Sequence, residues 1–336
     1  MSLPVVVAAA MFAGVVVYAV LGGADFGSGF WDLTAGDARR GGEVRALVDH
    51  SIGPVWEANH VWLIYVLVFW WTVFPRAFAA VTTTLYLPLA LALLGIVLRG
   101  ASFAFRKYAA TLRLAQAFGV VFATSSVVTP FFLGTVAGAI AAGRVPAGGH
   151  GDAIGSWVHP TSLTAGVLAV GTCSFLAGVF LTADAAHAGD AALSEHLRRG
   201  SLAVAAVTGV IVLAALVPVR QDAETLGDGL LGRAAPLVLA SVACGVLTLW
   251  ALVGRRHVLA RLGAVGAVVA VVLGWGVAQY PWLLVDQLSI ADAAGARSTQ
   301  AALLVVAALA VVIVVPPLAY LLWLTQQPER PTTSGA

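Results

Sequence analysis

Apolar runs of about twenty residues recur along the whole chain, and they restrict it to one class of fold. A helix of that length crosses a bilayer core of roughly 30 Å. Glycines, prolines and charged residues separate nine such runs. We expect membrane-spanning helices near residues 3–24, 58–75, 77–98, 116–142, 161–186, 201–219, 234–253, 258–280 and 301–325. The sequence therefore predicts an all-α, multi-pass membrane protein.

The composition supports one membrane domain over residues 1–330 and argues against a soluble domain. Hydrophobic residues make up 60% of the chain and charged residues 10%, whereas soluble domains carry about 25% charged residues. The least apolar stretch, around residues 25–57, is too short for a separate domain. The polar tail, residues 326–336, is expected to be disordered and cytoplasmic.

Cysteine and charge patterns exclude several kinds of site. Cys173 and Cys244 lie in apolar runs and outside any C-x-x-C motif, which argues against covalent haem, a zinc ribbon or a disulfide framework. The net charge of +2 is spread over short loops, so no basic face for nucleic acid is expected. No nucleotide-binding or hydrolase motif is found.

The distribution of basic residues predicts the orientation, because Lys and Arg near span ends stay on the cytoplasmic side. One set of alternate loops holds Arg39, Arg40, Arg45, Arg106, Lys107, Arg113, Arg198, Arg199, Arg255, Arg256, Arg261 and Arg330. The opposite set holds Arg76, Arg144, Arg220, Arg233 and Arg297. We therefore expect an external N-terminus and a cytoplasmic C-terminus.

Two local patterns predict how the spans are arranged. The second run ends at Phe74-Pro75-Arg76 and the third begins at once, which predicts a tight hairpin. The first run ends "VLGGADFG" and the fifth ends "FLTADAAHAG". This echo suits two four-helix bundles plus one extra helix, although two helix ends can also match by chance.

Six ionisable groups lie at or inside the predicted spans, where each costs about 2.5–3.5 kcal/mol at a helix centre. They are Asp25, Glu57, His60, Arg99, Asp184 and His187. Two interpretations are open. The carboxylates could relay protons from the cytoplasm, or Asp25 and Glu57 could cap helix ends, with Arg99 paired to one of them. The glycines around Asp25 are expected to give the chain a tight exit from the helix and close packing beside the second span, which would bring Asp25 and Glu57 together. Asp32 is expected to be solvated.

The segment "PVWEANHVWLI" is the densest in polar and aromatic groups. Glu57 and His60 are three residues apart, so they share a helix face, with Trp56 and Trp62 beside them. A metal bound by this acid and imidazole would lack further ligands. A bis-His haem site would need a second histidine, and His159 and His187 both lie at span ends. We therefore expect no metal and no haem bound by this chain alone.

Six ordered segments resemble subunit II of the cytochrome bd-type quinol oxidases, which are terminal respiratory oxidases of bacteria. They are "GGADFGSG", "WEANHVWLI", "FWWTVFPRAFA", "LRGASFAFR", "FFLGTVAGAI" and "QYPWLLVDQLSIADAA". The resemblance covers nearly the whole chain. It implies nine helices, an external N-terminus and a haem-bearing subunit I as partner in a heterodimer.

The same resemblance implies a division of labour and a set of site residues. Subunit I would hold two b-type haems, one d-type haem and most of the quinol site, while this chain would hold no redox centre and no catalytic residue. By the resemblance Asp25 and Glu57 would be proton-path acids, with Trp56, Asn59 and Arg99 as signature residues; His60 and Asp184 are added as proton-path candidates because they lie at the predicted spans. A bound quinone and small single-helix accessory subunits are compatible with it. The alternatives are a secondary transporter and a purely structural membrane partner.

Overall fold

The structure is a computed structural model that describes residues 2–36, 41–52, 56–106 and 108–325. Over these residues it contains thirteen helices and one two-stranded hairpin. The helices are α1 (Leu3–Thr34), α2 (Gly41–Ile52), α3 (Trp56–Val73), α4 (Pro75–Thr84), α5 (Tyr86–Arg106), α6 (Leu112–Ala141), α7 (Pro160–His187), α8 (Ala191–Asp222), α9 (Glu224–Leu231), α10 (Ala235–Val253), α11 (His257–Gln279), α12 (Ile290–Ala293) and α13 (Arg297–Thr325). Strands β1 (Trp282–Leu284) and β2 (Leu288–Ser289) pair antiparallel between α11 and α12. The predicted disordered tail, residues 326–336, lies outside the described residues.

Eight of the described helices are long and apolar enough to cross a membrane. They are α1, α5, α6, α7, α8, α10, α11 and α13. The bent pair α3 and α4 makes a ninth if it counts as one span. The prediction of an all-α, multi-pass membrane protein is therefore confirmed.

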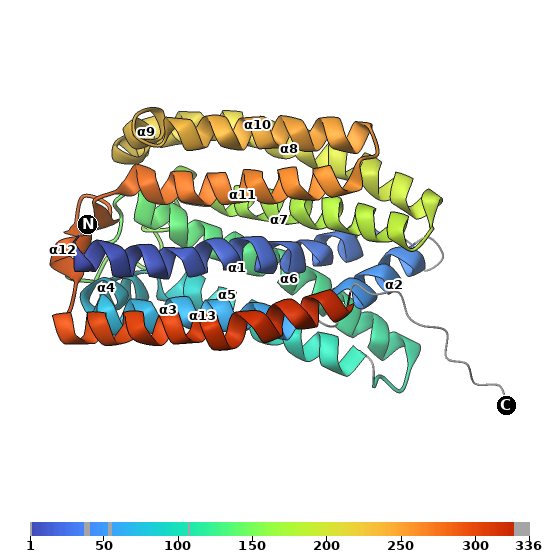
Figure 1. Ribbon diagram of the computed structural model, residues 1–336, viewed down its shortest axis with the longest axis horizontal. Coiled ribbons are helices and arrows are strands. Elements are labelled where there is room, and N and C mark those ends of the chain that lie inside the picture. The colour runs from blue at the N-terminus through green and yellow to red at the C-terminus, as the bar shows by residue number, and fades with distance from the viewer. Residues whose placement is uncertain (1, 37–40, 53–55, 107, 326–336) are drawn as a thin grey trace.

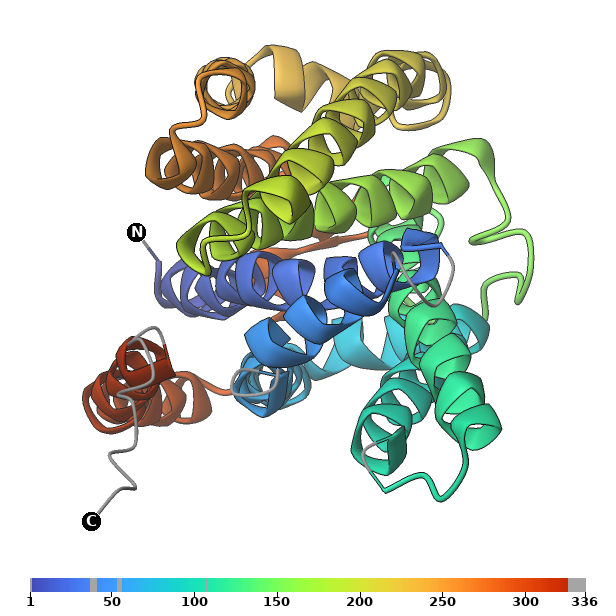
Figure 2. The same cartoon turned by 90° about the vertical axis from the view of Figure 1, so that its right-hand side faces the viewer.

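The long helices lie side by side and run between two ends of the molecule (Figure 1). The N-terminus, α4, α9 and α12 lie at one end, which we call the α12 end, and α2 lies at the other, the α2 end. Figure 2, which looks at the α2 end, places α1 and α7 in the middle of the assembly. Helices α1, α3, α5 and α6 form one group and α7, α8, α10 and α11 a second. Helices α1 and α6 pack extensively against α7 and so join the two groups, and α13 is added against α1 and α3.

The first helix is longer than the sequence predicted. We expected it to end at residue 24, where the glycines would let the chain leave the helix, but α1 continues to Thr34. Its glycines serve close packing instead. A Cβ on Gly27 would lie 1.9 Å from the backbone oxygen of Cys173 on α7, and one on Gly29 would lie 2.2 Å from Cβ of Ser126 on α6. Asp25 is therefore an interior residue of a helix that has neighbours on both sides.

The predicted tight hairpin after Phe74 is wrong. Helix α3 ends at Val73, Phe74 has φ −122° and ψ 55°, and α4 then leaves at 114° to α3. Pro75 has no N–H to donate, so α3 cannot continue through it. The chain turns a second time at Leu85 before α5 begins, so ten residues of α4 form the connection at the α12 end.

The outer helices present large apolar side chains to their surroundings. Examples on α8 are Val207, Val210 and Leu213, which are 60%, 67% and 68% exposed. Helices α10 and α13 carry similar side chains, including Leu239, Val253, Val312 and Ile313. Because a lipid bilayer solvates such groups, this surface suits a protein that lies within a membrane.

Candidate functional site

A buried ion pair links α1 to α5. Arg99 donates from Nη2 to Oδ1 of Asp25 at 2.5 Å and to the backbone oxygen of Asp25 at 3.2 Å. Arg99 is 1% exposed and Asp25 is 5% exposed. Removing two charges from water costs several kcal/mol per ion, so each partner depends on the other. The proposed pairing of Arg99 with one of the spanning acids is found, and the acid is Asp25.

Helix α6 supplies the remaining contacts of the guanidinium. Arg99 donates from Nε to the hydroxyl of Ser126 at 2.9 Å, and Ser126 in turn donates to the backbone oxygen of Phe122 at 2.6 Å. The guanidinium carbon lies 4.9 Å from the ring centroid of Phe122 and 5.0 Å from that of Phe26 on α1. Two aromatic rings and three acceptors thus replace water around this cation.

Glycines on α1 and α5 let both helices approach α6 closely. Gly29 on α1 faces Ser126, while a Cβ on Gly95 of α5 would lie 2.3 Å from Oγ1 of Thr129. Ser126 and Thr129 donate to backbone oxygens of their own helix and not to other helices. The hydroxyl-rich stretch of α6 is therefore a packing surface through which Arg99 reaches Asp25.

One carboxylate oxygen of Asp25 is buried without a hydrogen-bond partner. Oδ2 of Asp25 has no hydrogen-bond partner in the described part of the chain, and the same holds for the hydroxyl of Tyr18. The Tyr18 ring lies along the flat surface of Gly22, 3.0 Å from where a Cβ would be. Gly22 follows Tyr18 by one turn and precedes Asp25, so the ring extends toward the acid. A buried acid with one unpaired oxygen can exchange a proton with water or with a neighbouring hydroxyl.

The signature residues of α3 lie beside the same stretch of α1. Asn59 is 2% exposed and donates to the backbone oxygen of Leu21 at 3.3 Å. The ring of His60 lies 6.5 Å from that of Phe26, in an edge-on arrangement. The side chains of Trp56 and Glu57 lie outside the described residues, although both positions belong to α3. The backbone therefore brings the Glu57 segment next to α1.

A second buried acid lies two turns beyond Asp25, where we expected a solvated residue. Asp32 is 4% exposed, so that expectation is wrong. Its Oδ1 accepts from Nε of Arg45 at 2.8 Å, and its Oδ2 accepts from Nη1 of Arg106 at 3.1 Å. Arg45 belongs to α2 and Arg106 ends α5. Asp32 thus ties both elements to α1, and Asp25, Ser28 and Asp32 form one buried polar face of α1.

Asp184 lies at the same end of the molecule on α7, in a separate cluster. Oδ1 of Asp184 accepts from Arg261 on α11, and Oδ2 accepts from the hydroxyl of Ser51 on α2 at 3.1 Å. The side chain of Asp184 is 33% exposed. His187 follows one turn later as the last residue of α7. Asp184 therefore connects three helices at the α2 end and remains open to the surroundings.

One spacing in the sequence could have indicated both buried pairs. Asp25 and Asp32 are seven residues apart, as are Arg99 and Arg106. Seven residues make nearly two helical turns, so each pair of like residues lies on one face of its helix. The two carboxylates on α1 therefore meet the two guanidiniums on α5 in the same order.

In the described part of the chain, no three His, Cys, Asp or Glu side chains gather closely enough to bind a metal ion. The described residues therefore do not fit a metal centre of their own. Asp25 and Asp32 are occupied instead by arginines, and Asp184 by Arg261 and Ser51.

These features define a multi-pass membrane subunit that carries paired charges inside one of its helix bundles. The chain belongs to a family described as cytochrome bd terminal oxidase subunit II, whose model matches residues 3–325. The resemblance found in the sequence is thus confirmed.

Two relatives agree with this assignment. The cytochrome bd ubiquinol oxidase subunit 2 of Bacillus subtilis (strain 168) is 31% identical over 131 residues, which cover 39% of this chain and 37% of that protein. The bd oxidase structure from Geobacillus thermodenitrificans matches with a TM-score of 0.81 at 24% identity, over 97% of this chain and 99% of the matched chain. The second match shows that the fold is shared over nearly the full length of both chains.

Proposed function

We propose that this chain is the non-haem subunit of a bacterial quinol oxidase that reduces dioxygen to water. Two b-type haems and one d-type haem, with most of the quinol site, would lie in a partner subunit I. The family membership and the shared fold support this assignment. Each dioxygen consumes four electrons from quinol and four protons, and the protons must enter a site buried in the membrane.

The chain's own contribution would be a route for those protons from the α2 end. The observation that carries this proposal is the buried carboxylate of Asp25, which has one oxygen held by Arg99 and the other without a partner in the described chain. Arg99 holds one oxygen of the carboxylate, and the open oxygen would accept the proton in transit. Tyr18 would pass the proton onward, and Asp32 would anchor the entrance.

Two other proposed proton-path residues, Glu57 and His60, belong to α3, which packs against α1, whereas Asp184 lies in its own cluster on α7. Glu57 lies on α3 in the segment that Asn59 fixes to α1, and His60 packs against Phe26, the residue after Asp25. Asp184 is partly exposed at the α2 end, where it would collect protons from the surface. Trp56, Asn59 and Arg99 would hold this arrangement in place.

We also propose that the α2 end faces the cytoplasm, with the N-terminus outside. The larger set of basic residues supports this orientation. An alkaline phosphatase fusion at the C-terminus is expected to be inactive, because that enzyme needs the oxidising exterior. An active fusion would show that the C-terminus lies outside the cell. The α2 end, and with it the proton entrance, would then face the exterior.

Quinol-driven oxygen consumption by the purified complex tests the proton role. Asp25→Asn and Glu57→Gln are expected to reduce turnover about 10²-fold or more, since a positioned proton carrier contributes roughly 10²–10⁴-fold. The exposed Asp292→Asn at the α12 end is the matched control and is expected to retain turnover. Haem content, read from the optical spectrum, must stay normal in each variant.

The double variant Asp25→Asn/Arg99→Gln separates proton transfer from structural support. It removes both charges, so folding should recover relative to Asp25→Asn, while turnover stays low. If the double variant recovers turnover as well as folding, Asp25 does not carry protons and the subunit has a purely structural role. Haem bands in the purified chain without its partner would contradict the assignment of the redox centres to subunit I.

A further inference from the structure

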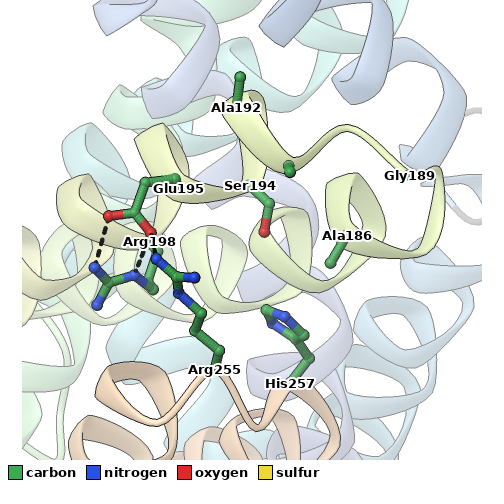
Figure 3. Close-up of a pocket in the computed structure, with 9 residues that line it drawn as sticks. Ala186, Gly189, Ala192, Ser194, Glu195, Arg198, Arg255 and His257 are labelled. Atoms are coloured by element: carbon green, nitrogen blue, oxygen red, sulfur yellow. Dashed lines mark hydrogen bonds and ion pairs between the residues drawn. The ribbon is translucent and has the colours of Figure 1, made fainter.

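A hollow of about 520 Å³ opens at the α2 end of the second helix group. It lies between the α7–α8 turn and the α10–α11 turn, away from the Asp25 cluster. Ala186, Gly189, Ala191, Ala192, Ser194, Glu195, Arg198, Arg255 and His257 line it. Figure 3 shows Arg255 and His257 rising from the α10–α11 turn toward Glu195 and Ser194 on α8.

The hollow has a surplus of positive charge. Glu195 accepts from Nε and Nη2 of Arg198 at 2.9 and 2.7 Å, from Nε of Arg199 at 2.8 Å and from Nη2 of Arg255 at 3.2 Å. Three guanidinium groups thus share one carboxylate. A guanidinium has five N–H donors in a planar fork that matches phosphate oxygens. The cluster therefore keeps both charge and donors for an anion.

Arg255 is the residue best placed to bind such an anion. Its side chain is 70% exposed, and Glu195 is its one side-chain hydrogen-bond partner in the described chain. Its backbone has φ 55°, in the left-handed region that favours glycine after a helix end. An arginine at this position places a guanidinium at the rim of the hollow at some cost in backbone strain.

An apolar groove lies further along the same helix. It measures about 280 Å³ and is lined by Ala206, Val207, Val210 and Ile211 of α8. One face of α8 carries Arg199, then Ala206 seven residues later, then Val210 four residues after that. The rise from Arg199 to Ala206 is about 10 Å at 1.5 Å per residue. Charge at the helix end and an apolar groove toward the membrane interior thus lie in line.

We propose that the hollow binds the phosphate group of an anionic phospholipid, with one acyl chain in the α8 groove. The charge surplus selects an anionic headgroup, since a zwitterionic one would add a cation beside three arginines. The apolar groove favours a lipid over a soluble phosphate, because a soluble phosphate would make no favourable contact with apolar side chains. Trp250, 52% exposed with Arg256 stacked at 4.5 Å, sits near the end of α10 as an interfacial anchor does.

Native mass spectrometry of the delipidated complex tests this site with phosphatidylglycerol, phosphatidylcholine and inorganic phosphate as probes. One tightly bound phosphatidylglycerol is expected, and phosphatidylcholine is expected to bind at least tenfold more weakly. Arg255→Gln should weaken phosphatidylglycerol binding roughly tenfold through the loss of a charged hydrogen-bond donor. Arg113→Gln removes an exposed charge at the same end and should leave binding unchanged.

A second variant distinguishes a lipid from a soluble anion. Ala206→Phe fills the exposed groove and should weaken phosphatidylglycerol binding while leaving the charged hollow intact. Equal binding of phosphatidylcholine, or equal effects of Arg255→Gln and Arg113→Gln, would overturn the site. Inorganic phosphate that binds as tightly as the lipid, with no effect of Ala206→Phe, would show a soluble-anion site and overturn the lipid assignment.

Discussion

Arg99 of α5 donates a 2.5 Å hydrogen bond to the carboxylate of Asp25 on α1, and neither side chain is more than 4% exposed. Helix α6 packs against both α1 and α5, so it holds the two charged residues close together without extensive direct contact between α1 and α5. The ion pair joins α1 to α5, and the separate hydrogen bond from Arg99 to Ser126 joins α5 to α6. Loss of Arg99 should therefore destabilise all three helices together.

Single removal of either charge is expected to lower the free energy of unfolding by about 3–5 kcal/mol, because the remaining charge stays buried without its partner. Asp25→Asn and Arg99→Gln should both show this loss. The double variant should recover most of it, because no isolated charge is left. Thermal unfolding of the detergent-purified protein measures the coupling, and additive losses in the double variant would refute it.

Asp32→Asn is expected to loosen α2. The substitution removes the carboxylate that Arg45 and Arg106 share, so the link between α2 and α1 weakens. Hydrogen–deuterium exchange in residues 41–52 should become faster. Asp49→Asn is the control, since Asp49 lies 3.7 Å from Arg106 and is 39% exposed; an equal effect there would show that Asp32 has no special role.

Gly27→Ala should prevent close packing of α1 on α7. The new Cβ would lie 1.9 Å from a backbone oxygen, which no side-chain rotation can relieve, and overpacking of this kind costs about 1–3 kcal/mol or more. Gly245→Ala in α10 meets nothing within 4 Å and should be neutral or gain about 0.5–1 kcal/mol. Melting temperatures that rank the two variants the other way would contradict this packing.

Stability should depend on the protonation of His159, which precedes α7 at the α12 end. Burial, and then the positive charge of Arg144, lower the pKa of His159, while Asp222 opposes the shift. Arg144 contacts Nε2 of His159, and Nδ1 lies 3.6 Å from Asp222. A histidine with a lowered pKa stabilises the fold above its ordinary value near 6.5, and this stabilisation is lost as pH falls through the folded pKa.

The melting temperature should therefore fall between pH 7.5 and pH 5, and His159→Gln should reduce that fall. Protonated His159 would face Arg144 with like charge, which is the physical cause of the loss. An unchanged pH dependence in His159→Gln would assign the effect to other groups.

Much of the fold follows from the sequence because membrane spans are encoded by length and hydropathy. The predicted spans at residues 161–186 and 234–253 differ from α7 and α10 by about one residue at each end. The first span fails because Gly22, Gly23, Gly27 and Gly29 look like helix breakers in isolation. In the folded chain Gly23 and Gly27 lie against α7, Gly29 lies against α6, and Gly22 lies under the ring of Tyr18.

The sequence predicts several members of the site and a pairing of Arg99 with a spanning acid, but it predicts neither which acid pairs with Arg99 nor the pairings of Asp32. Asp25, Asn59 and Arg99 stand out because polar groups are costly inside a span. From the sequence Asp32 is expected to be solvated, because the predicted span ends at residue 24. The docking of α2 buries Asp32, and it depends on Val44 and Val48, which pack into a core with Trp31. The sequence of a helix as short as α2 does not show which other helix it packs against.

The separation of Asp25 and Arg99 by 74 residues also concerns how the chain is made. At roughly 5–20 residues per second, a ribosome supplies Arg99 about 4–15 s after Asp25. During that interval α1 must carry its carboxylate without the cation that later neutralises it. We therefore expect newly made α1 to stay beside the insertion machinery until α5 arrives.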